Sequence, residues 1–285
     1  MAEKKPYRSS YVLANGVKTH YSESGDEGDP IVLLHGGGPG ASGEAGWRFM
    51  LPALAPYFRV YAPDQLSFGY TDTSALPTRA HQSLVDHIRD FVDALCLEKI
   101  NLVGNSQGAY VAAKYTLDHP DRVKKLLLIG SATIARFMGL NPPMTEGMKK
   151  LLAYNGTPEA LRAFLEEIVL DKSTITDELI ESRQRVVHRP GAGEARNAFE
   201  AANRNVPNDP SLREELDLRN KLPRLTVPTL FTWGVQDRFA PVELGYELQK
   251  LLPNMKFQFL KEAGHQCQTD APGVVNQLVI DFFKK

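Results

Sequence analysis

The chain alternates between two hydrophobic patterns, one typical of buried strands and one typical of amphipathic helices. Short runs that are apolar on both faces match strands covered on both sides of a parallel sheet. These runs lie at 31–34, 59–62, 100–103, 125–129, 227–233 and 256–260. Between them, apolar residues recur at helical spacing, most clearly at 84–97, 242–252 and 273–283. The alternation predicts an α/β fold whose mostly parallel sheet carries helices on both faces.

The beginning of the chain departs from this alternation. Residues 11–13 and 17–21 alternate between apolar and polar side chains on either side of Asn15-Gly16. This dipeptide between two alternating segments is a strong signal for a tight hairpin. We therefore expect an antiparallel hairpin before the first parallel strand.

A long segment in the middle of the chain has no strand pattern. From Ala132 to Leu225 every periodic stretch is helical, and helices are expected to begin near Met144, Thr157 and Thr176. We predict that residues 132–225 form a helical cap, which is inserted into a core formed by residues 1–131 and 226–285.

Composition and charge narrow the class of protein. The chain has 285 residues, a net charge of -1 and 42% hydrophobic residues, as expected of a soluble globular protein. It lacks the basic clusters that nucleic-acid binding requires, and no apolar stretch approaches the roughly 18 residues of a membrane span. We expect a cytoplasmic protein that acts on a small molecule and has no nucleic-acid or membrane partner.

One motif points directly to chemistry. Gly104-Asn105-Ser106-Gln107-Gly108 matches G-x-S-x-G, and it stands after a short apolar strand and before a helix. A nucleophile on such a sharp turn crowds the backbone, so the residues two positions before and after it must be small. We predict that Ser106 is the nucleophile of an α/β-hydrolase, rather than a serine that only caps the following helix.

A serine nucleophile needs a base, and the base needs an acid that orients it. In this architecture the chain order is Ser, acid, His, which leaves His188 in the helical segment and His265 after the strand at 256–260. We predict His265 as the base. Asp237 follows the strand at 227–233, and it is the predicted acid because the alternative loop, 130–140, contains no Asp or Glu. The histidines that we expect to be structural are His20, His81, His87 and His119.

Attack on a carbonyl creates an oxyanion, which preorganised backbone amides can stabilise. We predict the amide of Gln107, at the start of the helix after the nucleophile, and that of Gly37 in the glycine-rich loop. Cys267 stands two residues after His265, but it has no elbow motif, so we interpret it as a packed side chain. Both it and Cys96 are expected to be reduced. No ligand pair at metal spacing stands out, and we expect neither a metal nor another cofactor.

The glycine loop also permits a different reading. Residues 38–43 match G-x-G-x-x-G after a strand, and Asp64 follows about 20 residues later, as in dinucleotide-binding folds. Against this reading, the strand already ends at His35, and Pro52 interrupts the stretch that would be the phosphate-binding helix. The hydrolase hypothesis is preferred because it alone explains the elbow, the acid and the histidine together.

One arginine stands on the apolar face of a predicted cap helix. In the segment that begins at Thr176, Arg183 is three residues after Ile180 and four before Val187, so its side chain points where the helix packs. Such a charge either extends to solvent or binds an anion in the cleft. The spacing alone leaves both possibilities open.

Together these motifs resemble the meta-cleavage-product hydrolases, which cleave carbon–carbon bonds in aromatic degradation and are α/β-hydrolases with a helical cap. The similarity covers nearly the whole chain, and its most specific parts are the glycine loop and the cap arginine. The matching residues are His35-Gly36-Gly37-Gly38-Pro39-Gly40-Ala41, Gly104-Asn105-Ser106, Ile175 to Leu179, Arg183, Asp237 and Gly264-His265.

The resemblance implies an eight-stranded sheet, no cofactor and a homo-oligomer, specifically a dimer. It implies a 2-hydroxy-6-oxo-hexa-2,4-dienoate substrate, which is ketonised in the site and then cleaved by water to a 2-hydroxy-dienoate and a carboxylic acid. Arg183 would hold the dienoate carboxylate, Asn105 would line the pocket at the same end, and Gly38 and Gln266 would contact the substrate.

The chain also departs from the family pattern. Gln266 stands where a Trp usually follows the histidine, Gly46 stands where an Asn is common, and Gln107 replaces the usual apolar residue after the nucleophile. These changes affect the predicted pocket and leave the triad intact. Three hypotheses stay open: a carbon–carbon hydrolase leads, a carboxylesterase or lactonase with the same triad follows, and a catalytically silent binding protein is third.

Overall fold

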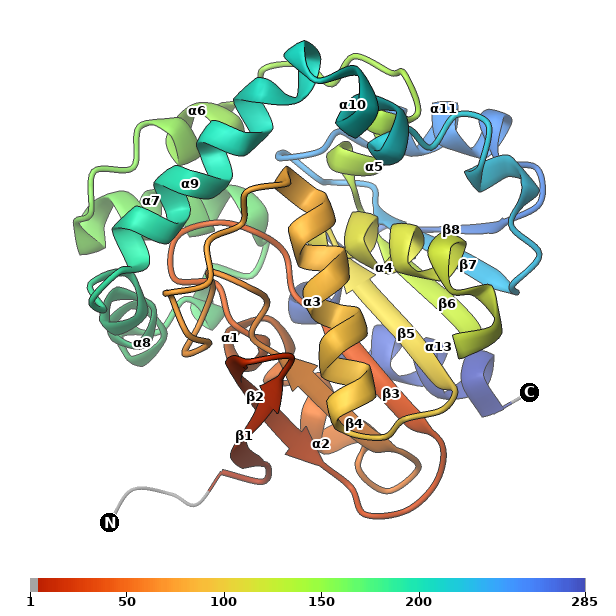
Figure 1. The fold of residues 1–285 in the computed structure, drawn as a ribbon, viewed down its shortest axis with the longest axis horizontal. Coiled ribbons are helices and arrows are strands. Elements are labelled where there is room, and N and C mark those ends of the chain that lie inside the picture. The colour runs from red at the N-terminus through yellow and green to blue at the C-terminus, as the bar shows by residue number, and fades with distance from the viewer. Residues whose placement is uncertain (1–4, 285) are drawn as a thin grey trace.

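The structure, a computed structural model that describes residues 5–284, is built on one eight-stranded sheet (Figure 1). The strand order is β1-β2-β4-β3-β5-β6-β7-β8, with antiparallel pairing of β1 with β2 and of β2 with β4, and parallel pairing elsewhere. The strands are β1 (Arg8–Ala14), β2 (Val17–Ser24), β3 (Pro30–Leu34), β4 (Arg59–Pro63), β5 (Ile100–Asn105), β6 (Val123–Ile129), β7 (Thr229–Gly234) and β8 (Lys256–Leu260). The predicted core segments also include residues 1–4 and 285, which lie outside the described residues.

Helices cover both faces of this sheet (Figure 1). On one face lie α3 (Ala80–Ala94), α4 (Gln107–Asp118), α5 (Ala132–Phe137) and α11 (Val242–Leu251). On the other lie α1 (Gly43–Trp47), α2 (Met50–Leu54), α12 (Cys267–Asp270) and α13 (Pro272–Lys284). The 3-10 turns are η1 (Pro120–Arg122), η2 (Lys172–Thr174), η3 (Val206–Asn208) and η4 (Leu222–Arg224).

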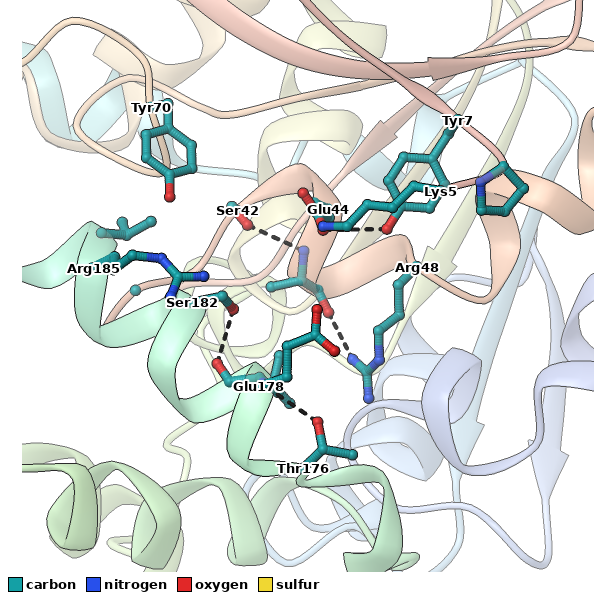
Figure 2. Close-up of a pocket in the computed structure, with 15 residues that line it drawn as sticks. Lys5, Tyr7, Ser42, Glu44, Arg48, Tyr70, Thr176, Glu178, Ser182 and Arg185 are labelled. Atoms are coloured by element: carbon teal, nitrogen blue, oxygen red, sulfur yellow. Dashed lines mark hydrogen bonds and ion pairs between the residues drawn. The ribbon is translucent and has the colours of Figure 1, made fainter. Parts of the chain in front are cut away.

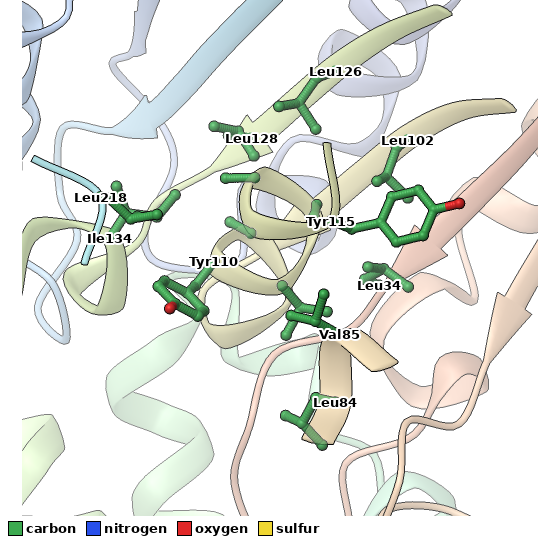
Figure 3. Close-up of a cluster of buried hydrophobic side chains, with 14 of the residues drawn as sticks. Leu34, Leu84, Val85, Leu102, Tyr110, Tyr115, Leu126, Leu128, Ile134 and Leu218 are labelled. Atoms are coloured by element: carbon green, nitrogen blue, oxygen red, sulfur yellow. The ribbon is translucent and has the colours of Figure 1, made fainter. Parts of the chain in front are cut away.

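The sheet separates two hydrophobic clusters, which explains why its central strands have no polar face. In β3, Ile31 and Leu33 pack with α1, α2 and α13, whereas Val32 and Leu34 pack with α3 and α4. Strand side chains alternate between the two faces, so both sets must be apolar when both faces are covered. Figure 3 shows part of the cluster that contains Val32 and Leu34, in which helices α3 and α4 cover the strands. The labelled side chains are Leu34, Leu84, Val85, Leu102, Tyr110, Tyr115, Leu126, Leu128, Ile134 and Leu218.

Between β6 and β7 the described chain forms only helices and turns. After α5 come α6 (Glu146–Leu152), α7 (Pro158–Ile168), α8 (Asp177–Val187), α9 (Ala192–Asn205) and α10 (Pro210–Leu216). Side chains of α7 and α8 form a separate hydrophobic cluster, which includes Phe164 and Ile180. In contrast, Ile134 and Leu218, near the two ends of this segment, pack into the main core (Figure 3). The assignment of residues 132–225 to one cap stays a prediction.

The predicted fold class is confirmed: the sheet has eight strands, is mostly parallel and is covered by helices. Thr145, Thr157 and Thr176 cap the amino ends of α6, α7 and α8 at the positions where helices were expected. The sequence pattern gave no helix at α9, because α9 is mostly polar and buries only Ala195.

Two absences concern only the part of the chain that the structure describes. Along residues 5–284, none of the helices combines the length and the hydrophobicity needed to cross a membrane. In the same residues, no three His, Cys, Asp or Glu side chains are grouped as a metal site would require.

Asp64, which follows β4, is a buried carboxylate that joins three segments. Its Oδ2 accepts hydrogen bonds from His20 Nδ1 and from the Tyr70 amide, both at 2.7 Å, and its Oδ1 accepts one from the Gly43 amide at 2.6 Å. The Nε2 of the same imidazole lies 2.7 Å from Ser9 Oγ. Ser9, His20 and Asp64 therefore form a hydrogen-bonded chain, which fixes the β1–β2 hairpin to the loops that follow β3 and β4.

We predict that Asp64→Ala lowers the free energy of unfolding by about 3–5 kcal/mol, because it leaves two buried donors and one part-buried donor without their acceptor. The control is Asp29→Ala, which removes a half-exposed carboxylate that is paired with Lys124, and it should cost less than about 1 kcal/mol. Urea unfolding followed by circular dichroism measures both losses. Equally small losses in the two variants would contradict the joining role of Asp64.

Candidate active site

The residues around Ser106 form a sharp turn between β5 and α4. The backbone of Ser106 has φ 57° and ψ -119°, a conformation that is strained for a side chain larger than glycine. The turn closes tightly: a Cβ at Gly104 would lie 2.3 Å from the Gly108 carbonyl oxygen, and one at Gly108 would lie 2.2 Å from that of Leu34. The small residues of the motif are therefore required by close backbone contacts on both sides of Ser106.

Ser106 and His265 line one cavity, with a volume of about 510 Å³, which we name the Ser106 cavity. The glycine loop and the elbow contribute one part of its wall. Residues of the helical segment between β6 and β7, such as Met148 and Phe164, contribute another, and Phe239 from the loop after β7 a third. The cavity is therefore enclosed by the core and by the helical segment together.

His265 and Asp237 are brought together by the loops that follow β8 and β7. His265 Nδ1 lies 2.8 Å from Asp237 Oδ2, and both side chains are buried. The other carboxylate oxygen, Oδ1, accepts hydrogen bonds from the amides of Phe239 at 2.8 Å and Ala240 at 2.7 Å. The Phe239 ring packs against the imidazole with centroids 4.7 Å apart. Asp237 is thus fixed by main-chain donors and in turn orients the histidine ring.

The contact between nucleophile and base is looser. In the described residues, Ser106 and His265 face the same cavity without forming a hydrogen bond. Such a bond is often long or misaligned in an enzyme without substrate and tightens when substrate binds. His188, the other downstream histidine, is bonded to Gln184 on the surface of α8. His20 belongs to the chain with Ser9 and Asp64, and none of those three residues lines the Ser106 cavity.

The glycine loop lies directly beside the elbow. A Cβ at Gly36 would lie 3.2 Å from Ser106 Cβ, and one at Gly37 would lie 3.0 Å from the side-chain oxygen of Gln107. Gly37 and Gln107, the two predicted oxyanion donors, are therefore neighbours at the cavity wall. His35 fixes the start of this loop, because its Nδ1 donates to the Gly36 carbonyl at 2.8 Å and its Nε2 accepts from the Gln65 amide at 3.1 Å. Burial lowers the pKa of His35, which favours this neutral form.

Asn105 connects the elbow to the histidine loop. Its Nδ2 donates to the carbonyls of Ile129 at 3.2 Å and His265 at 3.1 Å. Its Oδ1 is 3.4 Å from the Nε2 of Gln268, which also lies 3.5 Å from the Gly46 carbonyl. The structure thus gives Asn105 a positioning contact in addition to its place on the cavity wall. Sequence analysis missed Gln268. Its buried side-chain amide lies between Asn105 and Gly46, two positions that the comparison with the family pattern had already singled out.

Arg183 lies behind the glycine loop. Its side chain is 4% exposed, its Nε donates to the Pro39 carbonyl at 2.9 Å, and its Nη2 is 3.8 Å from the Cβ position of Gly38. Burial, and secondarily the charge of Arg48, lowers the pKa of Arg183 to about 10, so it remains protonated at neutral pH. Among the described residues it forms no ion pair with a carboxylate. Arg183 therefore does not extend to solvent, and its charge is available to an anion.

Gln266 and Gly46 occupy the remaining departures from the family pattern. Gln266 lines the cavity, and its main-chain amide donates to the Ile168 carbonyl of α7 at 3.0 Å. A Cβ at Gly46 would lie 3.1 Å from His35 Cβ, so a larger residue there would push against the histidine that fixes the glycine loop. The chain therefore pairs a small residue at this position with the packed ring of His35.

The structure argues against the dinucleotide reading of this loop. The Gly43 amide, which would face a phosphate, is instead bonded to Asp64. The helix that follows has only five residues, Gly43–Trp47, and the Gly40 Cβ position is 2.3 Å from the Arg183 carbonyl oxygen. Helix α8 thus covers the space that a pyrophosphate would need.

A larger pocket, of about 900 Å³, lies between α1 and α8 (Figure 2). Several of its polar side chains already have partners: Lys5 and Tyr7 both contact Glu44, and Arg48 donates to two backbone carbonyls. None of the three predicted triad residues lines it. We therefore place the candidate active site in the smaller Ser106 cavity, because chemistry and geometry coincide there.

Comparison with known proteins supports this description of the fold. The family defined by the alpha/beta hydrolase fold matches residues 29–272, so the chain belongs to the α/β-hydrolases. The 2-hydroxymuconate semialdehyde hydrolase of Pseudomonas sp. (strain CF600) is 33% identical over 271 residues, which are 95% of this chain and 92% of that protein. Within the α/β-hydrolases, the chain therefore belongs to the family of meta-cleavage-product hydrolases, as the sequence motifs predicted.

Solved structures show the same relationship. A serine-to-alanine variant of the meta-cleavage product hydrolase from Pseudomonas fluorescens IP01, complexed with acetates, is 31% identical. It superposes with a TM-score of 0.81 over 96% of this chain and 97% of that chain. The 2-hydroxy-6-oxo-6-phenylhexa-2,4-dienoate hydrolase from Rhodococcus sp. strain RHA1 is 25% identical, with a TM-score of 0.83 over 98% and 99%.

The two cysteines offer a test of this site that is independent of catalysis. Burial raises the pKa of the Cys267 thiol, whereas Cys96 is exposed. Because the thiolate is the reactive form, we predict that Ellman's reagent at pH 8 labels Cys96 in the folded protein and leaves Cys267 unmodified. Cys96→Ser should then show no reaction until the protein is unfolded. Rapid labelling of Cys267 in that folded variant would contradict its packing against the histidine loop.

Proposed function

We propose that this protein hydrolyses a carbon–carbon bond in 2-hydroxy-6-oxo-hexa-2,4-dienoates, with Ser106 as nucleophile, His265 as base and Asp237 as the acid that orients it. The observation that carries this proposal is the buried Arg183, whose charge has no carboxylate partner among the described residues. A buried cation without a counter-ion is costly unless a ligand supplies the anion. The carboxylate of a dienoate would do so, whereas a simple ester has no group for it.

The chemistry follows from the leaving group, which is carbon. In the substrate, ketonisation moves the enol proton to carbon, so that the fragment to be expelled can take up the electron pair as a conjugated enolate. Ser106 Oγ then attacks the C6 carbonyl carbon while His265 accepts the hydroxyl proton. The C5–C6 bond breaks, and the histidine returns the proton to the dienoate fragment.

The second half of the reaction consumes one water molecule. His265 activates the water, which attacks the acyl group on Ser106 and releases a carboxylic acid and the free hydroxyl. In both halves the oxyanion forms beside the amides of Gly37 and Gln107, each of which is expected to contribute about 10² to 10³ in rate. Arg183 holds the dienoate carboxylate, and Gly38, which lines the cavity in front of it, keeps that approach open.

The known substrates of the relatives differ in the group attached to C6. By name, one relative acts on a semialdehyde and another on a 6-phenyl compound. The departures at Gln107, Gly46 and Gln266 fall on the cavity wall or beside it. We therefore propose the dienoate class on the strength of Arg183.

The first test is the loss of dienoate absorbance with wild type and Ser106→Ala, beside a p-nitrophenyl ester. We expect serine-dependent cleavage of the dienoate, because ketonisation makes its C5 a competent leaving group. Ser106→Ala should lose at least about 10³-fold in kcat for both substrates. Rapid ester cleavage with inert dienoates would overturn the proposal in favour of a carboxylesterase or lactonase, and inertness toward both would favour a binding protein.

The second test concerns Arg183. Arg183→Met should lower kcat/KM for the dienoate by roughly 10- to 150-fold, the value of a hydrogen bond to a charged group, about 1.5–3 kcal/mol. Arg183→Lys should recover part of the loss, because it restores the charge without the forked geometry. The matched control is Arg185→Met on the exposed face of the same helix, which should leave the rate unchanged. Equal loss of ester and dienoate hydrolysis in Arg183→Met would indicate a structural role instead.

A further inference from the structure

An unpaired cation lines the Ser106 cavity itself, whereas Arg183 lies behind the glycine-loop part of its wall. Arg136 stands in the last turn of α5, is exposed and contributes to the cavity wall. Among residues 5–284 its guanidinium forms no hydrogen bond or ion pair that the structure records. Helices α5 and α8, which carry Arg136 and Arg183, are well separated in Figure 1. The two cations therefore stand on different elements, Arg136 on the cavity wall and Arg183 behind the glycine loop.

One acidic residue beside α5 does not neutralise Arg136. The amide of Leu218 donates to the Phe137 carbonyl, which places Asp217 close to the end of α5. The carboxylate of Asp217, however, is already bonded to the guanidinium of Arg219 through both of its oxygens. The positive charge of Arg136 is thus free to act on a ligand in the cavity.

Other polar groups surround Arg136 on the cavity wall. Thr133 and Asn141 line the cavity on either side of it along the chain, and neither side chain forms a recorded hydrogen bond within the described residues. His81 lines the same wall, and its Nδ1 is buried without a partner. Burial, and then the charge of Arg136, lowers the pKa of His81 to about 4, so its ring is neutral near pH 7. Sequence analysis expected His81 to be structural, whereas the structure places it in the cavity.

Much of the cavity wall away from the glycine loop and the elbow is apolar. Phe137, Leu140, Phe164, Ile168 and Phe239 contribute to it. A ligand that satisfies both ends therefore needs a negative charge at each end and an apolar, unsaturated middle that passes Ser106. A dienoate with an alkyl or phenyl group at C6 satisfies only the end at Arg183.

We propose that Arg136 determines specificity by binding a second carboxylate on the group attached to C6, with Thr133, Asn141 and His81 as its polar neighbours. This inference rests on the proposed function and deepens it. The substrate is then a 2-hydroxy-6-oxo-dienedioate, and hydrolysis consumes one water molecule to release a 2-hydroxy-dienoate and a dicarboxylic acid. The reaction that supplies such a substrate must be the oxidative ring opening of an aromatic diol that carries a carboxylated side chain.

The test compares two dienoates that differ only in the C6 substituent, 2-carboxyethyl and the similarly shaped but uncharged 3-methylbutyl. For the wild type, we expect kcat/KM to favour the acidic compound by about tenfold, the value of one hydrogen bond to a charged group. In Arg136→Met this ratio should fall about tenfold, and raising the salt concentration should lower the wild-type ratio, because an exposed charge is screened. Arg136→Lys should retain part of the preference.

The control is Arg213→Met, which removes an equal charge from α10, outside the cavity wall, and should leave the ratio unchanged. A wild-type preference for the uncharged compound, or an unchanged ratio in Arg136→Met, would overturn the assignment of Arg136.

If both dienoates are inert while an ester is cleaved, the proposed function fails. The subsite is then tested by inhibition of ester hydrolysis with a straight-chain dicarboxylate and with the matching monocarboxylate. A dicarboxylate advantage that Arg136→Met abolishes would support the subsite, and equal inhibition would refute it.

Discussion

The close backbone contact at the elbow is the constraint on which the rest of the site depends. Gly108 can approach the Leu34 carbonyl only because it has no Cβ, and this approach places the glycine loop after β3 beside Ser106. The Ser106 amide also donates to the Ile129 carbonyl of β6 at 2.9 Å. Three neighbouring strands thus fix the nucleophile, and they balance the strain of its positive φ through hydrogen bonds and packing that the sheet already provides.

Hydrogen bonds from main-chain amides also hold the histidine loop and join it to the helical segment. The Asp270 carboxylate accepts the Gly264 amide at 2.7 Å and the Leu170 amide, beyond α7, at 2.7 Å. The main-chain amide of Gln266 donates to the Ile168 carbonyl. These bonds tie the loop that carries His265 to the segment that closes the cavity. The position of the histidine loop is therefore coupled by hydrogen bonds to that of α7, which contributes to the cavity wall.

Sequence analysis predicted those features of the fold and the site that depend on local residue patterns. Strands, the hairpin, the elbow and the chain order of acid and histidine each leave a short-range signal, and the structure brings Asp237 to His265 as that order required. It did not predict features that depend on long-range contacts. His81 and Arg136 lie on helices with ordinary periodicity, and only the folding of α3 against α5 places them in one cavity. Gln268 was missed for the same reason, because its partners are far away in the sequence.

The spacing around Arg183 left two possibilities, and burial decides between them. An arginine that extended to solvent would keep most of its hydration, whereas Arg183 retains its charge at 4% exposure with a single carbonyl contact from Nε. Replacing a buried unpaired ion by a packed apolar residue is often neutral or stabilising, so stability gives no reason for a guanidinium at this position. The cost of burying it becomes useful only when an anion enters, because the attraction then acts in a region from which water is largely excluded. The structure thus holds Arg183 in an environment that disfavours its charge, and in the proposed function the dienoate carboxylate relieves that penalty.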